Sequence, residues 1–142
     1  MTMTAPSVYS KFETELRIRP DDIDMNNHVH NSHYLDYVLA ARYDQMTRCY
    51  KMSMDEFVAR GFAWVVKSCH IEYKRALVLS DTIIVRTWVD RMEKTGVVVR
   101  FEIVKKESGK LASDGVFEYT MISSSSGRPA EIPEDVIQKY SV

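Results

Sequence analysis

Between Asp22 and His33 the chain carries an unusual concentration of short polar side chains. Two carboxylates, three amides and three imidazoles fall within twelve residues: Asp22, Asp24, Asn26, Asn27, His28, His30, Asn31 and His33. A buried core has no use for such a cluster, whereas a loop on a rigid scaffold can aim these groups at a substrate. A carboxylate can act as a nucleophile or as a general base toward water, and a nearby amide or imidazole can orient it.

Asp24, Asn26 and His28 alternate along this segment, so their side chains point together if the backbone is locally extended. One interpretation is a catalytic group centred on the Asp24 carboxylate. The other is an Asx-rich turn that caps the following helix, which is a common arrangement of such residues. The residue types alone leave both interpretations open.

A long helix is expected directly after this loop. Asn31 and Ser32 are good N-cap residues, and an apolar run begins at Tyr34. The start of a helix offers free backbone N–H groups and a positive dipole end, which together can hold a polarised carbonyl. Burial on most sides of the helix is predicted from the residues of its apolar surface, which are Tyr34, Leu35, Tyr37, Val38, Leu39, Ala41, Arg42 and Met46.

The remaining elements follow from alternation and turn signals. Residues 11–19 alternate as a half-buried strand, and Ser53 with Glu56 forms a capping box for a short helix that Gly61 can end. Further strands are expected over residues 62–79, 82–90, 96–106 and 110–123, with a helical turn or two from Pro133 to Tyr140. Consecutive strands after helices indicate an α+β fold, in which an antiparallel sheet wraps around the one long helix.

Length and composition narrow the class of protein. The 142 residues are expected to form a single domain spanning 1–142, with residues 1–8 frayed. A net charge of −1 favours neither nucleic acid nor anionic lipid, and no apolar run is long enough to span a membrane. The N-terminus lacks the features of a signal peptide, and Cys49 and Cys69 are interpreted as free thiols of a cytoplasmic protein.

Two stretches of the chain resemble a known family, the hotdog-fold acyl thioesterases of the 4-hydroxybenzoyl-CoA thioesterase type. The first runs from Arg19 to Tyr37, and its Asp-Met-Asn-Asn-His-Val segment is similar to the acyl-ACP thioesterase version. The second is Ile-Glu-Tyr-Lys-Arg at residues 71–75, followed by Asp81. The resemblance covers most of the chain and implies a hotdog sheet of about five strands, paired into homodimers or homotetramers that share active sites.

The resemblance also implies roles for individual residues. Asp24 matches the acid that attacks the thioester or activates water, and Asn26 and His28 match the groups that position it. Glu72 matches a further acidic residue. The implied oxyanion site is made of the backbone N–H groups of Val29, His30, Asn31 and Ser32, which agrees with the preference of helix starts for negative charge. The weaker substrate-binding candidates are Tyr34, as part of an acyl pocket, and Arg91, Lys94 and Thr95, in a turn where relatives bind coenzyme A phosphates.

One departure concentrates the chemistry on Asp24. Many relatives carry Glu-Glu-Ala-Arg in the helix, whereas this chain has Leu-Ala-Ala-Arg at residues 39–42 and no helical acid. A metal site built from His28, His30 and His33 with a neighbouring aspartate is a rival interpretation, but its spacing matches no established ligand set, so we expect no metal and no cofactor.

The predicted function is therefore hydrolysis of an acyl thioester, with acyl-CoA favoured over acyl-ACP as the substrate. A non-catalytic acyl-CoA-binding hotdog protein is the alternative from another class. A hotdog dehydratase is a second rival, although such enzymes use a helical acid that is missing here. The sequence leaves open the acyl chain length, an aromatic or aliphatic preference, and whether Asp24 acts as nucleophile or base.

Overall fold

A computed structural model of the chain describes residues 9–142, so the expected fraying of residues 1–8 lies outside the described residues. Five antiparallel strands form one sheet in the order β1-β3-β4-β5-β2. The elements are β1 Phe12–Arg17, α1 Tyr34–Arg48, α2 Met54–Ala59, β2 Phe62–Tyr73, β3 Thr82–Met92, β4 Gly96–Lys105, β5 Leu111–Ser123 and α3 Glu134–Tyr140. The predicted sheet of about five strands around one long helix is confirmed.

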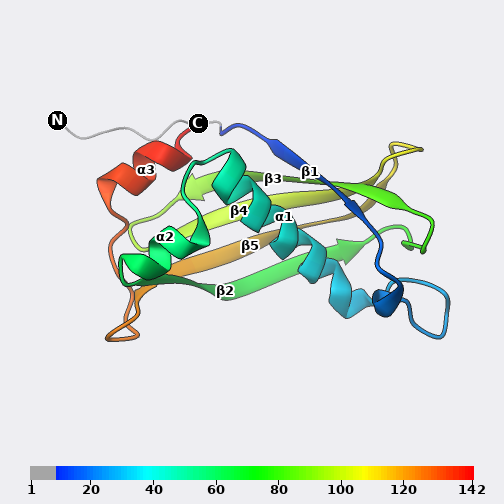
Figure 1. The fold of residues 1–142 in the computed structure, drawn as a ribbon, viewed down its shortest axis with the longest axis horizontal. Helices are drawn as coiled ribbons and strands as arrows, with labels where there is room; N and C mark the ends of the chain where they lie inside the picture. The colour runs from blue at the N-terminus through cyan, green and yellow to red at the C-terminus, as the bar shows by residue number, and fades with distance from the viewer. Residues whose placement is uncertain (1–8) are drawn as a thin grey trace.

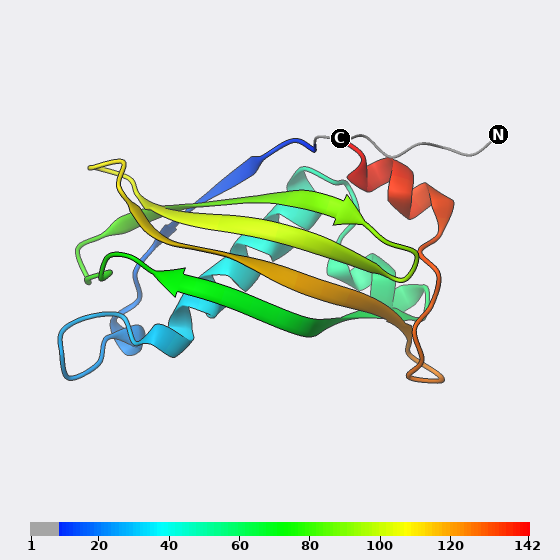
Figure 2. The same cartoon turned by 180° about the vertical axis from the view of Figure 1, so that it is seen from behind.

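The sheet curves around α1, which crosses one of its faces (Figure 1). The two short helices, α2 and α3, lie at one end of the sheet, and the polar loop before α1 lies at the other (Figure 2). This second end also holds the hairpin turn between β4 and β5. The fold therefore separates the polar loop from α2 and α3 by the length of the sheet.

The helix α1 is buried on one face only. Tyr37, Val38, Ala41 and Gln45 are at most 4% exposed, and they pack on the sheet. Leu39 and Tyr43, one turn apart, are 37% and 56% exposed. The prediction of burial on most sides is wrong for a single chain, because periodicity reports the apolar surface of a helix but not how much of it the same chain covers.

Most element boundaries agree with the predicted ranges to within a few residues. The exception is β2, which ends at Tyr73 rather than at residue 79, because the chain turns and Lys74 and Arg75 both donate to the Ala112 carbonyl. The capping box of α2 is present, since the Ser53 hydroxyl accepts a 3.3 Å hydrogen bond from the Glu56 N–H.

Gly115 marks the tightest point in the packing of the sheet. It lies in β5 opposite Phe101 of β4, whose ring is fully buried against α1. A Cβ atom on Gly115 would lie 2.7 Å from that ring, which is closer than carbon atoms approach each other. Glycine is therefore required here by space rather than by backbone conformation.

Candidate active site

An open hollow of about 500 Å³ lies at the start of α1. Its wall combines the polar loop, the first residues of the helix and the chain that leaves β2. The lining residues are Asp24, Asn26, His28, Val29, His30, Asn31, Tyr34, Tyr73, Lys74, Arg75 and Ala76. The structure thus brings together the predicted acid, its two predicted supports, three of the four predicted oxyanion residues and Tyr34.

The loop from Asp24 to His28 is a tight turn rather than an extended segment. The Asp24 N–H donates to the His28 carbonyl at 2.9 Å, and the Asn26 N–H donates to Asp24 Oδ1 at 2.8 Å. Asn27 adopts a left-handed φ of 61°, which asparagine tolerates better than most residues. The condition of a locally extended segment is therefore not met, and the backbone here forms an Asx turn, the local geometry of the second interpretation.

The turn leaves Asp24 partly available for chemistry. One carboxylate oxygen holds the turn, and no residue in the range 9–142 donates to the other, Oδ2. Asn26 and His28 are exposed on the same hollow, yet neither side chain hydrogen-bonds to Asp24. A catalytic hydrogen bond is often formed only with substrate present, so this geometry keeps both residues as candidates.

The start of α1 differs from the prediction in where its cap lies. A 3-10 turn at residues 31–33 precedes α1, and the His30 imidazole caps it by accepting a 3.2 Å hydrogen bond from the Ser32 N–H. The predicted caps, Asn31 and Ser32, are therefore already inside the turn. The N-cap preference for short polar side chains favoured Asn31 and Ser32. An imidazole nitrogen can also accept the capping hydrogen bond from a backbone N–H.

Only one of the four predicted oxyanion N–H groups is available. Val29 donates to the Leu77 carbonyl at 2.8 Å, His30 donates to the Asp22 carbonyl at 2.9 Å, and Ser32 donates to His30. The Asn31 N–H has no hydrogen-bond partner among the described residues, and Asn31 lines the hollow. The structure therefore narrows the candidate donors at the helix start to Asn31.

Tyrosine hydroxyls anchor this region to the rest of the fold. Tyr73 at the end of β2 donates a 2.8 Å hydrogen bond to the Asn31 carbonyl, and its ring packs edge-on against Tyr34. Tyr37 donates a 2.6 Å hydrogen bond to the carboxylate of Asp22, which is only 4% exposed. Burial raises the pKa of Tyr37 to about 12, so its hydroxyl remains a donor at neutral pH. Sequence reasoning did not predict the Tyr73 contact, which depends on packing between segments far apart in the chain.

Glu72 does not join this hollow within one chain. It neighbours Tyr73 in β2, and successive strand side chains point to opposite faces of a sheet. Glu72 lies with His70 and Arg100 on the face away from α1, where Lys74 Nζ is 3.6 Å from its carboxylate. The expectation of a second acid beside Asp24 is therefore not met in a single chain.

The predicted phosphate-binding turn is also remote. Arg91 lies near the end of β3 rather than in the turn as predicted, and Lys94 and Thr95 connect β3 to β4. This end of the sheet is the one occupied by α3, where the Ile132 N–H donates to the Lys94 carbonyl. The polar loop before α1, which contains Asp24, lies at the opposite end (Figure 2). The cations that do line the hollow are Lys74 and Arg75, which directly follow β2.

The three imidazoles have different partners. His33 lies 3.0 Å from Asp36 and 3.5 Å from Asp22, and its ring centre lies 6.1 Å from that of His30, whose ring caps the turn before α1. Within residues 9–142, no three His, Cys, Asp or Glu side chains are grouped so that they could hold a metal ion. Nor does any helix in this range have the length and apolar character required to cross a bilayer.

Comparisons with known proteins place the chain in a family. Residues 18–140 match the family model described as the thioesterase-like superfamily, and the chain belongs to this family. It is 24% identical over 110 residues to the long-chain acyl-CoA thioesterase FadM of Escherichia coli, covering 78% of this chain and 82% of that protein. It is 22% identical to the acyl-CoA thioester hydrolase YbgC of E. coli over 129 residues, covering 91% and 95%.

The same fold is present in solved structures. A DHNA-CoA thioesterase from Staphylococcus aureus superposes with a TM-score of 0.86 at 23% identity, covering 92% of this chain and 89% of that one. This likeness establishes the hotdog fold, as the sequence resemblance predicted. The roles of individual residues rest on the geometry described above.

Proposed function

We propose that this protein hydrolyses acyl-CoA thioesters in the hollow at the start of α1. The observation that carries this proposal is the presence, in one hollow, of a carboxylate oxygen and a backbone N–H that have no hydrogen-bond partner within residues 9–142. These belong to Asp24 and Asn31. Membership of the thioesterase-like superfamily and the names of FadM and YbgC support the same reaction.

In this mechanism the Asn31 N–H stabilises the negative charge that develops on the thioester oxygen. In one route Asp24 removes a proton from water, the resulting hydroxide attacks the carbonyl carbon, and the C–S bond breaks. In the other route Asp24 itself attacks the carbonyl carbon and displaces the thiolate, and water then hydrolyses the acyl–Asp24 anhydride to the free acid and the carboxylate. In both routes the thiolate of coenzyme A takes up the proton that the water releases. Asn26 and His28 orient the acid and the water. Lys74 and Arg75 supply positive charge at the rim, where the pantetheine arm and phosphates of coenzyme A would enter.

The test is release of free thiol from a panel of acyl-CoA and acyl-ACP substrates by the wild-type protein and by Asp24→Asn. Release of thiol by the wild-type protein but not by Asp24→Asn supports hydrolysis at this site. Tight binding of acyl-CoA without turnover would instead support a non-catalytic binding protein. Conversion of a 3-hydroxyacyl-CoA in the panel to an unsaturated thioester, with release of water and no free thiol, would identify a dehydratase.

We further propose that the site is completed in a homodimer formed through β2. This strand is an edge of the sheet, and its Val65 and Val66 are 40% and 50% exposed. Leu39 and Tyr43 of α1 are also exposed, and they share a pocket lining with Trp64 of β2. An uncovered edge strand with apolar residues favours pairing with another chain. Pairing about a two-fold axis is antiparallel, so it sets the Tyr73 end of one β2 against the Phe62 end of the other.

In such a dimer, the end of the β3–β4 hairpin of one subunit, residues 91–95, lies near the Asp24 hollow of the other. Arg91, Lys94 and Thr95 therefore remain substrate-binding candidates. Light scattering and activity should be measured together for the wild-type protein and for Val66→Lys, which places a charge on the edge. We expect an active wild-type oligomer and a less active, smaller variant. A wild-type monomer with full activity would contradict the proposal.

We also assign the protein to the cytoplasm. Both cysteines, Cys49 and Cys69, are free thiols, which is the state that reducing compartments maintain. Fractionation of cells that produce the full chain tests this assignment, and recovery in a membrane or exported fraction would contradict it.

A further inference from the structure

A buried guanidinium in the middle of α1 lacks an acidic partner. Arg42 is 8% exposed, and no carboxylate among residues 9–142 lies within ion-pair distance of it. Its one hydrogen bond runs from Nη1 to the Thr87 hydroxyl at 3.2 Å, and its guanidinium lies 5.4 Å from the centre of the Tyr50 ring. Arginine is rarely buried to this extent unless it is paired, because removing its charge from water is costly.

Neutral neighbours hold Arg42 in place without balancing its charge. The Thr87 hydroxyl that accepts from Arg42 donates its own proton to the Gln45 side chain. The Gln45 amide in turn donates to the Thr14 hydroxyl at 3.0 Å. This chain of hydrogen bonds ends where the Thr14 hydroxyl donates to the Asp44 carboxylate at 2.6 Å, and Asp44 is not within ion-pair distance of Arg42. The chain fixes the orientation of the guanidinium and leaves Nε and Nη2 without partners among the described residues.

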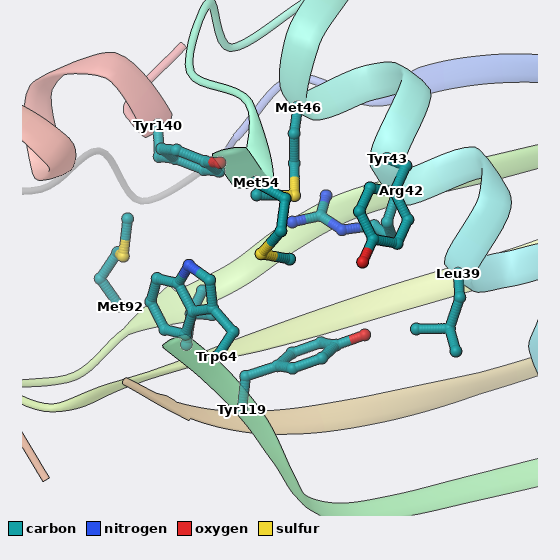
Figure 3. A pocket seen from close by; sticks show the side chains of 10 residues that line it. Leu39, Arg42, Tyr43, Met46, Met54, Trp64, Met92, Tyr119 and Tyr140 are labelled. Carbon is teal, nitrogen blue, oxygen red and sulfur yellow. The ribbon is translucent and has the colours of Figure 1, made fainter. Parts of the chain in front are cut away.

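Arg42 lines a small, otherwise apolar cavity of about 50 Å³ enclosed by α1, α2, α3 and the sheet. Figure 3 shows the guanidinium among Met46, Met54 and Tyr140, with Trp64 and Tyr119 on the opposite wall. The exposed Leu39 and Tyr43 stand on the outer side. A space of this size holds a few water-sized groups, which suits the end of a chain rather than a whole ligand.

A second donor faces the same space. The Tyr119 hydroxyl makes no hydrogen bond with any described residue, and burial raises its pKa to about 12, so it keeps its proton at neutral pH. Figure 3 shows this hydroxyl directed along the cavity toward Leu39 and Tyr43. Arg42 and Tyr119 therefore offer hydrogen-bond donors, and no carboxylate lines the cavity to accept from them.

The cavity lies within reach of the candidate active site. Tyr34 lines the Asp24 hollow and Arg42 lines the cavity, and the eight-residue step from Tyr34 to Arg42 spans about 12 Å of helix. An extended chain covers that distance with roughly ten single bonds, given the length of an extended backbone. An acyl group of roughly this length, held at its thioester by Asp24 and Asn31, would place its far end at Arg42.

We propose that the preferred substrates are acyl-CoAs whose chain ends in a carboxylate, and that Arg42 and Tyr119 bind this terminal carboxylate. The inference rests on the proposed function, since it concerns the acyl group of the same substrate. Arginine matches a carboxylate both in charge and in the geometry of its donors. A plain alkyl end would leave the buried guanidinium as unpaired as it is without a ligand.

The kinetic test compares dodecanedioyl-CoA, as the monothioester, with dodecanoyl-CoA. We expect the wild-type kcat/KM to favour the diacid thioester by about tenfold or more, as befits a charge-assisted hydrogen bond. Arg42→Met should bring this ratio close to one. Arg100→Met is the matched control, because Arg100 lies on the other face of the sheet, 3.3 Å from Asp90, and it should retain the wild-type ratio.

A second variant keeps Arg42 and remains informative if Arg42→Met fails to fold. Leu39→Glu introduces a carboxylate one turn before Arg42, at an exposed position where the two side chains can pair. We expect this internal carboxylate to compete with that of the substrate and to abolish the preference for the diacid thioester. Leu39 also belongs to the apolar surface of the proposed dimer, so light scattering and turnover of dodecanoyl-CoA at the wild-type rate are the controls for an intact assembly. An unchanged ratio in a folded Leu39→Glu protein would overturn the proposal, as would a wild-type preference for dodecanoyl-CoA.

A binding measurement separates this inference from the proposed function. Trp64 lines the cavity, whereas Trp88, the other tryptophan, packs beside Lys11 on the opposite face of the sheet. In a Trp88→Phe background, titration with free dodecanedioate should change the Trp64 fluorescence at lower concentration than dodecanoate does. Binding of the diacid without any thioesterase activity would contradict only the proposed function. Hydrolysis of plain acyl-CoA with no selectivity for the diacid would contradict only the proposed carboxylate site at Arg42 and Tyr119.

Discussion

The Tyr73 hydroxyl donates a 2.8 Å hydrogen bond to the backbone carbonyl of Asn31, so the last residue of β2 holds the residue whose N–H faces the candidate active site. The N–H and the carbonyl of Asn31 belong to adjacent peptide units joined at the Asn31 Cα, so a hydrogen bond that holds the carbonyl limits the movement of the neighbouring N–H. This contact therefore restrains the proposed oxyanion donor, and it couples the end of the sheet to the start of α1.

Tyr73→Phe should lower kcat more than it raises KM. Without the hydroxyl, the Asn31 carbonyl loses a hydrogen bond worth about 0.5–1.5 kcal/mol. The Asn31 N–H is then less well oriented when charge develops on the thioester oxygen. We expect a decrease in kcat of up to about tenfold, with little change in thermal stability. Steady-state kinetics check this, and an unchanged kcat would show that the contact does not position the donor.

Asp24→Asn should reduce hydrolysis by about 10²-fold or more, because the amide cannot serve as a base. The amide oxygen can still accept the hydrogen bond from the Asn26 N–H, so the turn and the fold should be preserved. Asp21→Asn, an exposed neighbour in the same loop, is the control for loss of charge. Near wild-type turnover by Asp24→Asn would remove Asp24 from the mechanism.

Tyr50→Phe should leave the protein as stable as the wild type or make it more stable, by up to about 1–2 kcal/mol. The Tyr50 hydroxyl is buried and has no hydrogen-bond partner among residues 9–142, whereas its ring stacks on Tyr140 at 4.3 Å. Phenylalanine keeps the stacking and removes the unsatisfied hydroxyl. Chemical denaturation measures the change, and a clear loss of stability would mean that the hydroxyl has a partner beyond the described residues.

Asp44 should contribute stability that depends on pH. Hydrogen bonds from Arg48 and from Thr14 hold the pKa of Asp44 below its ordinary value of 3.8. A lowered folded-state pKa means that the stabilisation is present above about pH 4 and is lost as the pH falls through the folded-state pKa. Because Asp44 is partly exposed, we expect Asp44→Asn to cost no more than about 1 kcal/mol at neutral pH.

Unfolding by urea at neutral pH and near pH 3 tests this dependence. The difference between the wild-type protein and Asp44→Asn should shrink on acidification. Asp55→Asn, at an exposed position of α2, serves as the comparison. A difference that grows as the pH falls would show that the sign of the linkage is wrong.

The sequence predicted the fold because its signals were local. The alternation of residues 11–19 predicted β1, and Leu16 and Ile18 do pack into the core. The polar loop was found from its residue types alone. Its shape was not, since the left-handed φ of Asn27 and the turn around Asp24 follow from hydrogen bonds that a residue pattern does not contain.

Sequence reasoning did not predict which residues from distant parts of the chain lie together. Glu72 was grouped with Asp24 by family likeness, but the alternation of β2 turns it to the other face of the sheet. Arg42 was correctly placed on the apolar face of α1, yet the cavity in front of it exists only where α2, α3 and β2 meet that helix. The periodicity of a strand or helix predicts which face of the element carries a side chain. It does not predict which other segments pack against that face.

Gly115 has a consequence for how variation in this protein should be interpreted. Because Gly115 has no side chain, the Phe101 ring fits under α1. Any replacement would push apart strands that have no part in the proposed chemistry of Asp24. In a library of random variants selected for activity, we expect Gly115 to tolerate as little change as Asp24. The two cases separate when the inactive proteins are recovered. Those altered at Asp24 should accumulate as folded material, and those altered at Gly115 should be degraded or aggregate.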